Sequence, residues 1–207
     1  MRNSCYAAEG GIAGRWHLPD LKITPVHRSG ASGTTFVVTN HLSTINQAWK
    51  KGPGAGMSVP WPAGVRAMGN DGIAEIIQKT PGAIGYLGYG SALKHKLALA
   101  SLENKAGKFV APTLESSQAG VANLKLEDNL RTFVPDPEGD ASYPLVTFTW
   151  IVARKKYSNP VTAATLKNLL NYGLSDTQQK ESSKLGYIPL PPAIVEKVLK
   201  QVDRLDS

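Results

Sequence analysis

Cysteine is almost absent from the sequence, since Cys5 is the only one among 207 residues. A single thiol forms no disulfide within the chain, and it excludes a zinc site built from several cysteines. The histidines follow neither the HxH nor the HxxxH spacing that would suggest a metal site. They are His17, His27, His41 and His95. We therefore expect no bound metal and no other cofactor.

Long hydrophobic runs are also missing. No apolar segment approaches the roughly 20 residues that a helix needs to cross a bilayer, which excludes a membrane-spanning protein. Residues 1–16 lack the apolar core of about 7–15 residues that defines a secretory signal. The residues alone therefore predict that the chain, as encoded, stays in the cytoplasm or depends on a signal outside this sequence.

Aromatic residues make up only 7% of the chain, although its net charge is +7. The basic residues are dispersed, and their longest cluster is Arg154-Lys155-Lys156. A protein that binds nucleic acid usually concentrates its basic residues on one stripe and places aromatic residues among them. We therefore favour a solvated basic surface and expect no nucleic-acid partner, with a basic interaction protein as an alternative.

Glycine and proline, by contrast, are frequent, with 20 and 14 residues. Such frequent turns argue against a helical bundle and favour a mixed α/β or a β-rich fold. Hydrophobic periodicity predicts alternating strands and helices over the first three quarters of the chain. We expect strands at 22–27, 83–87, 97–102 and 145–153, and helical segments at 35–49, 72–79, 91–95 and 113–124.

The pattern changes after Leu145–Ala153, the segment richest in strand-forming residues. Everything beyond it is predicted to be helical, with helices at 161–172, 175–183 and 193–205. Earlier in the chain, Asn70 or Asp71 is the predicted N-cap of helix 72–79. The whole indicates an α/β layer fold followed by a helical part that is too short to bury a core by itself.

The segment Arg28–Thr34 lies between a predicted strand and a predicted helix. The first backbone N–H groups of a helix have no partner within it, and the helix dipole places partial positive charge there. Ser32 and Thr34 add hydroxyl donors, and the guanidinium of Arg28 can bind two oxygens at once. On its own the segment fits a simple capped turn better than an anion site. It is not a Walker A motif, because no lysine follows the glycine.

Four ordered blocks of sequence are more specific than this loop. They are ITPVHRSGASGTTFVVTNHLS (Ile23–Ser43), GNDGIAEIIQKTPGAIGYLGYG (Gly69–Gly90), YPLVTFTWIV (Tyr143–Val152) and LGYIPLPPAIVEKV (Leu185–Val198). Together they make residues 21–207 resemble the PstS-type phosphate-binding proteins of bacterial phosphate ABC transporters. The resemblance implies a type II periplasmic-binding-protein fold, in which two α/β lobes close on phosphate.

The resemblance also implies a site. The family's phosphate contacts in this lobe carry over to Arg28, Ser32, Gly33 and Thr34. Arg28 would pair with phosphate oxygens and Ser32 would donate its hydroxyl, while Gly33 and Thr34 would donate backbone N–H groups. The block Gly69–Gly72 would cap a helix and would not contact the ligand.

Two departures from the family pattern matter. The family usually has an aspartate two residues after the arginine, where this chain has Gly30. The family's amino-terminal lobe, with its own phosphate loop and a carboxylate, has no counterpart here. We therefore expect a non-family segment at 1–20, one complete α/β lobe at 21–148 and a helical remnant of the other lobe at 149–207.

The implied function is that of a solute-binding protein, or a truncated remnant of one, for phosphate uptake. Its implied partners are inorganic phosphate and the permease subunits of an ABC transporter. A truncated gene, a fragment, and the second part of a split gene, in which a separate chain supplies the missing lobe, all fit the sequence. The family works in the periplasm. An enzyme is not expected, because Ser32 has no recognisable base and no carboxylate pair lies near the loop. A non-functional fragment remains an alternative.

Overall fold

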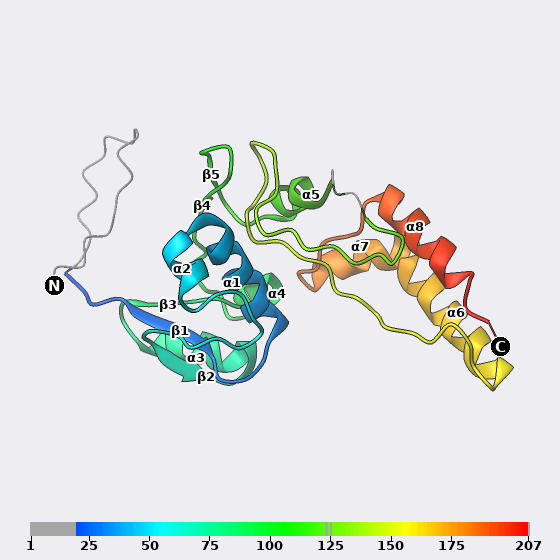
Figure 1. The fold of residues 1–207 in the computed structure, drawn as a ribbon, viewed down its shortest axis with the longest axis horizontal. Helices are drawn as coiled ribbons and strands as arrows, with labels where there is room; N and C mark the ends of the chain where they lie inside the picture. The colour runs from blue at the N-terminus through cyan, green and yellow to red at the C-terminus, as the bar shows by residue number, and fades with distance from the viewer. Residues whose placement is uncertain (1–19, 123, 125, 207) are drawn as a thin grey trace.

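The computed structural model describes residues 20–122, 124 and 126–206. The predicted segment 1–20 therefore lies outside the described residues except for Asp20, and so does Cys5. Figure 1 shows a parallel sheet with its helices at one end of the molecule and a separate group of helices at the other. A hairpin and a short helix lie between them.

The sheet that positions the predicted anion loop has three parallel strands in the order β2-β1-β3. They are β1 (Thr24–Arg28), β2 (Val65–Ala67) and β3 (Ala83–Gly85). Because β1 is central, its carboxyl end at Arg28 emerges between the ends of two neighbouring strands. In open parallel sheets this edge is where ligands bind.

The two faces of β1 pack against different elements, because successive side chains of a strand point to opposite faces. Val26 is 2% exposed and packs with Ile73 of α3 (Gly69–Lys79) in the main hydrophobic cluster. His27 is buried on the other face and stacks on Trp61, with ring centroids 5.0 Å apart. Trp61 in turn stacks on Tyr86, so the face of His27 carries an aromatic layer.

The helix predicted at 35–49 is two helices, α1 (Gly33–Ile45) and α2 (Gln47–Lys51). Asn46 lies between them as the C-cap of one and the N-cap of the other. Its Oδ1 accepts a hydrogen bond from the backbone N–H of Trp49 at 2.9 Å. The hydrophobic periodicity continues across this point, but the asparagine side chain competes for backbone hydrogen bonds and starts a new helix.

The middle of the chain contains α4 (Tyr89–Lys94), the hairpin strands β4 (Leu102–Glu103) and β5 (Phe109–Val110), and α5 (Leu114–Ala122). The two helices confirm the predictions at 91–95 and 113–124. The strand predicted at 97–102 is wrong, because only its last residue enters β4. A second hydrophobic cluster holds this region together; it contains Val121, Val134 and Val146, with Leu124 and Phe148 packed against them.

The carboxyl-terminal helices are α6 (Pro160–Leu174), α7 (Asp176–Lys184) and α8 (Pro192–Val202), which confirms the predicted helical end. The Oδ1 of Asn159 caps α6 by accepting the N–H of Val161 at 2.9 Å. Within the described part of the chain, no helix has both the length and the apolar character that crossing a membrane requires.

The strand predicted at Leu145–Ala153 is wrong, because these residues form no strand. Their apolar side chains are instead open to solvent at the end of the segment, where Ile151 is 71% exposed and Val152 is 96% exposed. A strand exists only when a second strand accepts and donates its backbone hydrogen bonds. None of the described strands lies beside this segment, which runs as the yellow-green connection between the two ends of the molecule (Figure 1).

Candidate functional site

Ser32 closes the loop between β1 and α1. It is the N-cap of α1, and its Oγ accepts a long hydrogen bond of 3.5 Å from the backbone N–H of Thr35. Its own N–H donates to the carbonyl of Met57 at 2.9 Å, and the residue is only 7% exposed. A hydroxyl that accepts at its oxygen still has its proton to donate. Ser32 is therefore fixed in place with one donor left for a ligand.

The start of α1 beside Ser32 is open. Gly33 is exposed, and a Cβ built on it would meet no atom within 4 Å. The N–H groups of Gly33 and Thr34 belong to the first turn, where a helix offers no carbonyl to bind them. Together with the positive end of the helix dipole, these amides form a surface that favours an anion.

Arg28 is held at both its backbone and its side chain. Its backbone N–H donates to Tyr86 Oη at 3.2 Å, and its Nη1 donates to Asn70 Oδ1 at 3.2 Å. Tyr86 Oη also lies 2.7 Å from Thr35 Oγ1. The tyrosine hydroxyl thus joins the end of β1 to the first turn of α1, which are the two sides of the candidate anion loop.

Asn70 is not the helix cap that the sequence predicted, and neither is Asp71. Helix α3 begins earlier, at Gly69, with Met68 at the N-cap and no side-chain cap hydrogen bond. Gly69 has a φ of 68°, a conformation that glycine adopts more readily than other residues. Asn70 therefore lies inside the first turn, and its side chain bonds Arg28 and Ser91 instead.

The side chain of Asp71 contacts residues at the end of α4. Its Oδ1 lies 2.7 Å from His95 Nε2 and 3.7 Å from Lys94 Nζ, both at the end of α4. The hydrogen bond from His95, and then the charge of Lys94, hold the pKa of Asp71 below its ordinary value. Among the residues that the structure describes, no carboxylate lies within 4.0 Å of the guanidinium nitrogens of Arg28.

A small pH effect is expected from this contact. Because the pKa of Asp71 is lowered in the folded chain, the stabilisation is present above the ordinary aspartate pKa of about 4 and is lost as the pH falls through the lowered value. Thermal melting from pH 7 to pH 3 should show a slightly larger loss for the parent chain than for Asp71→Asn. Identical curves would show that the exposed contact with α4 contributes nothing.

The loop thus brings Arg28, Ser32, Gly33 and Thr34 to one edge of the sheet. The sequence reasoning missed Tyr86 as an anchor and assigned Asn70 the wrong task. A signal was present for Tyr86, because it lies within the predicted strand 83–87, whereas the sequence predicts no strand before Asn70, where β2 is found. Parallel strands bring the residues after them together, whatever their distance in sequence.

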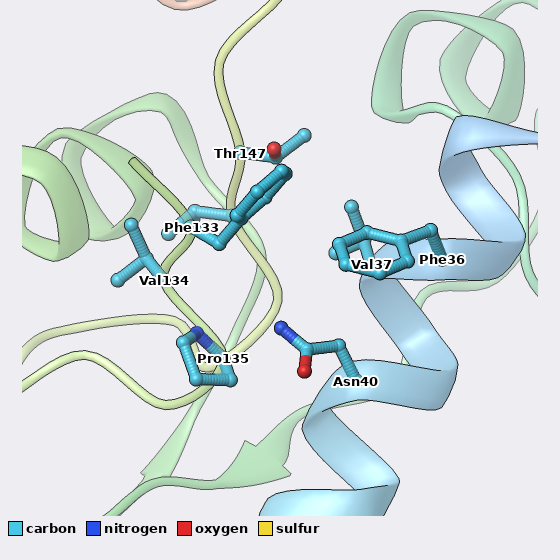
Figure 2. Close-up of a pocket in the computed structure, with 8 residues that line it drawn as sticks. Phe36, Val37, Asn40, Phe133, Val134, Pro135 and Thr147 are labelled. Atoms are coloured by element: carbon cyan, nitrogen blue, oxygen red, sulfur yellow. The ribbon is translucent and has the colours of Figure 1, made fainter. Parts of the chain in front are cut away.

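Two hollows in the described part of the chain lie along α1, and neither is lined by residues of this loop. Figure 2 shows one of them, where Phe36 and Val37 of α1 face Phe133 of a later segment. Its volume is about 10 Å³, no more than the space of one water molecule. Close by, His41 Nδ1 lies 2.5 Å from the carbonyl oxygen of Pro135. This hollow is a small gap where α1 packs against residues 133–147, and it is too small to hold a ligand.

The described residues contain no group of three or more His, Cys, Asp or Glu side chains that could hold a metal ion. The groups gathered at the loop are hydrogen-bond donors: a guanidinium, a hydroxyl and backbone amides. Such a set can bind an oxyanion, and it offers no paired acid and base for chemical catalysis.

Sequence comparison finds relatives that are named phosphate-binding proteins. The chain is 37% identical over 187 residues to "Phosphate-binding protein PstS" of Pasteurella multocida, covering 89% of this chain and 54% of that protein. The protein of the same name from Xylella fastidiosa is 35% identical, with 88% and 50% covered. The one from Methanocaldococcus jannaschii is 36% identical, with 91% and 53% covered. The chain spans about half the length of the curated relatives that it matches.

Solved structures support the fold. One is a high-affinity periplasmic phosphate-binding protein, PfluDING, bound with phosphate; it aligns with a TM-score of 0.64 at 20% identity, covering 85% of this chain and 56% of that one. A human phosphate-binding apolipoprotein aligns with a TM-score of 0.62 at 18% identity, covering 85% and 57%. These likenesses confirm the predicted α/β, periplasmic-binding-protein-like fold class.

The relatives are named as binding proteins and not as enzymes. Their resemblance to this chain, first indicated by four blocks of sequence, is therefore confirmed over most of its length. A model of the PBP superfamily domain matches residues 10–177, well over half of the 207 residues. The chain belongs to the PBP superfamily.

Proposed function

We propose that the chain binds inorganic phosphate through Arg28, Ser32, Gly33 and Thr34, as part of a solute-binding protein for phosphate uptake by an ABC transporter. One observation carries the proposal. Ser32 caps an open helix start in the same loop as Arg28, and the Arg28 guanidinium has no carboxylate partner among the described residues. The names of the relatives support phosphate as the anion.

The donors of the loop fit a phosphate ion in number and type. The guanidinium gives a charged fork for two oxygens, the Ser32 hydroxyl gives one donor, and the amides of Gly33 and Thr34 give two more. All of these groups donate, so they recognise oxygens that accept. A protonated phosphate oxygen needs an acceptor, and we propose that the other half of the ligand shell supplies it. The loop alone should then discriminate poorly between phosphate and sulfate.

The remaining parts of the proposal follow from the resemblance to whole phosphate-binding proteins. Residues 21–148 form the lobe with the loop, and residues 149–207 belong to the second lobe. The assembled protein works in the periplasm, delivers phosphate to the permease subunits and acts by binding and release without chemical conversion. No metal or cofactor takes part.

The test is a phosphate titration followed by two-dimensional ¹H–¹⁵N NMR on the labelled chain. We expect the amide signals of Gly33 and Thr34 to show the largest shifts. The dissociation constant for phosphate should be about 1 mM, because one half-open loop binds an anion weakly in water. Ser32→Ala removes one donor to a charged ligand and should weaken binding by about tenfold to a hundredfold.

Ser58→Ala serves as the control, since this serine lies in the loop before β2 and outside the candidate site. Shifts that spread evenly over lysine-rich surfaces, or that stay unchanged in Ser32→Ala, would contradict the assignment. A separate titration with sulfate should give shifts at the same amides with a similar midpoint.

A further inference from the structure

We propose that Asn70 is the positioning residue for Arg28, and that it aims the guanidinium at the ligand while leaving its positive charge uncompensated. The part of this inference that concerns phosphate rests on the proposed function. The positioning itself concerns the chain without ligand and is tested separately below.

The first support is a chain of hydrogen bonds that fixes the amide of Asn70. Its Nδ2 donates to Ser91 Oγ at 3.3 Å, and its Oδ1 accepts from Arg28 Nη1 at 3.2 Å. An amide has one end that donates and one that accepts. The bond to Ser91, on α4, therefore turns the accepting end toward the arginine.

The second support is the way the other end of Arg28 is held. The backbone N–H of Arg28 is bound to Tyr86 Oη, which also contacts Thr35 at the start of α1. With its backbone fixed by Tyr86 and one guanidinium nitrogen fixed by Asn70, the side chain has few directions left. An arginine that is held before the ligand arrives loses less rotamer freedom on binding.

The third support is the charge of the surroundings. The carboxylate nearest in sequence to Asn70 is Asp71, and it pairs with His95 and Lys94. Two residues beyond Arg28, Gly30 provides no side chain at all. A neutral amide thus does the orienting work that a carboxylate often does for arginine, and the full charge of the guanidinium stays available to an anion.

The inference gives different expectations for the position of Arg28 in two substitutions of similar size. Asn70→Leu removes the acceptor, so Arg28 loses its support and phosphate affinity should fall by about threefold to tenfold. Asn70→Asp keeps an acceptor at the same place but adds a negative charge. It should hold Arg28 in position, lower the phosphate affinity and reduce the dependence of binding on salt concentration.

The experiment measures the guanidinium directly and then phosphate. The ¹⁵N side-chain signals of Arg28, assigned through their loss in Arg28→Lys, are recorded without ligand in the parent chain, Asn70→Leu, Asn70→Asp and the control Asn171→Leu. Asn171 lies on α6 and is exposed. We expect Asn70→Leu alone to broaden and average the Arg28 signals. Each chain is then titrated with inorganic phosphate in low and in high salt, and melting curves check that all four are folded.

Unchanged Arg28 signals in a folded Asn70→Leu would overturn the positioning role. Averaged signals in Asn70→Asp as well would show that the accepting oxygen is not what matters. If the Arg28 signals respond as expected but the parent chain does not respond to phosphate, the positioning stands and the proposed function fails. If phosphate binds and Asn70→Leu leaves its affinity unchanged, the inference fails and the proposed function stands.

Discussion

Replacing Arg28 with alanine is expected to lower phosphate affinity at least as much as Ser32→Ala, by about a hundredfold or more. The side chain is the one formal charge placed at the loop, and its fork provides two donors to the ligand. The fold should survive the change, because the substitution keeps the backbone N–H that bonds Tyr86. Because the parent chain itself is expected to bind with a dissociation constant of about 1 mM, the heat of phosphate binding in calorimetry and the amide shifts of Gly33 and Thr34 should both disappear.

Arg154→Ala is the matched control for Arg28→Ala. It removes one arginine charge from an exposed position outside the sheet, where the backbone N–H of Arg154 donates to Tyr157 Oη. If a general attraction of a basic chain for anions were responsible for binding, both variants would lose affinity equally. That outcome, or an intact response in Arg28→Ala, would move the phosphate site away from this loop.

Gly64→Ala is expected to cause a large loss of stability, roughly 2–5 kcal/mol. Gly64 directly precedes β2 and has a φ of 121°, which side chains rarely tolerate. A Cβ there would lie 2.6 Å from the carbonyl oxygen of Pro25 and 3.0 Å from His27 Cδ2, both in β1. The backbone cannot yield without moving β1 and β2 apart. The melting temperature should fall by roughly 5–15 °C.

Gly173→Ala provides the opposite expectation. Gly173 lies near the end of α6, and a Cβ there would meet no atom within 4 Å. Alanine should stabilise the helix by about 0.4–1 kcal/mol, since it restricts the unfolded chain at no cost to the folded one. Equal melting temperatures for the two glycine variants would show that the contact between Gly64 and β1 is not a constraint in solution.

Sequence patterns predicted this fold best where a few adjacent residues decide the outcome. Asn159-Pro160 marks the start of α6, since asparagine caps and proline fits the first turn. Ser32 precedes α1 in the same way. The members of the candidate loop could be identified as a group because all lie within Arg28–Thr34.

The predictions from sequence patterns were wrong where a residue far away in the sequence determines the local structure. Leu145–Ala153 has the composition of a strand, but a strand needs a neighbour, and the described residues provide none. The neighbours of Asn70 in the sequence predict a helix cap, which the structure does not show. The side chain of Asn70 instead binds Arg28, which is 42 positions away. Tyr86, whose hydroxyl accepts a hydrogen bond from the backbone N–H of Arg28, is 58 positions away from it. Hydrophobic periodicity carries no information about such pairs.

The unpaired segment that ends at Ile151 and Val152 has a consequence for handling the protein. Exposed apolar residues on a backbone with free donors and acceptors form a template for pairing between copies. The next residues, Arg154-Lys155-Lys156, are exposed and carry three positive charges, which repel a second copy as gatekeeper residues do. Salt screens this repulsion within a Debye length of about 8 Å at physiological ionic strength. The colloidal stability of the isolated chain is therefore greatest in dilute, low-salt solution, and concentrated stocks in high salt favour aggregates.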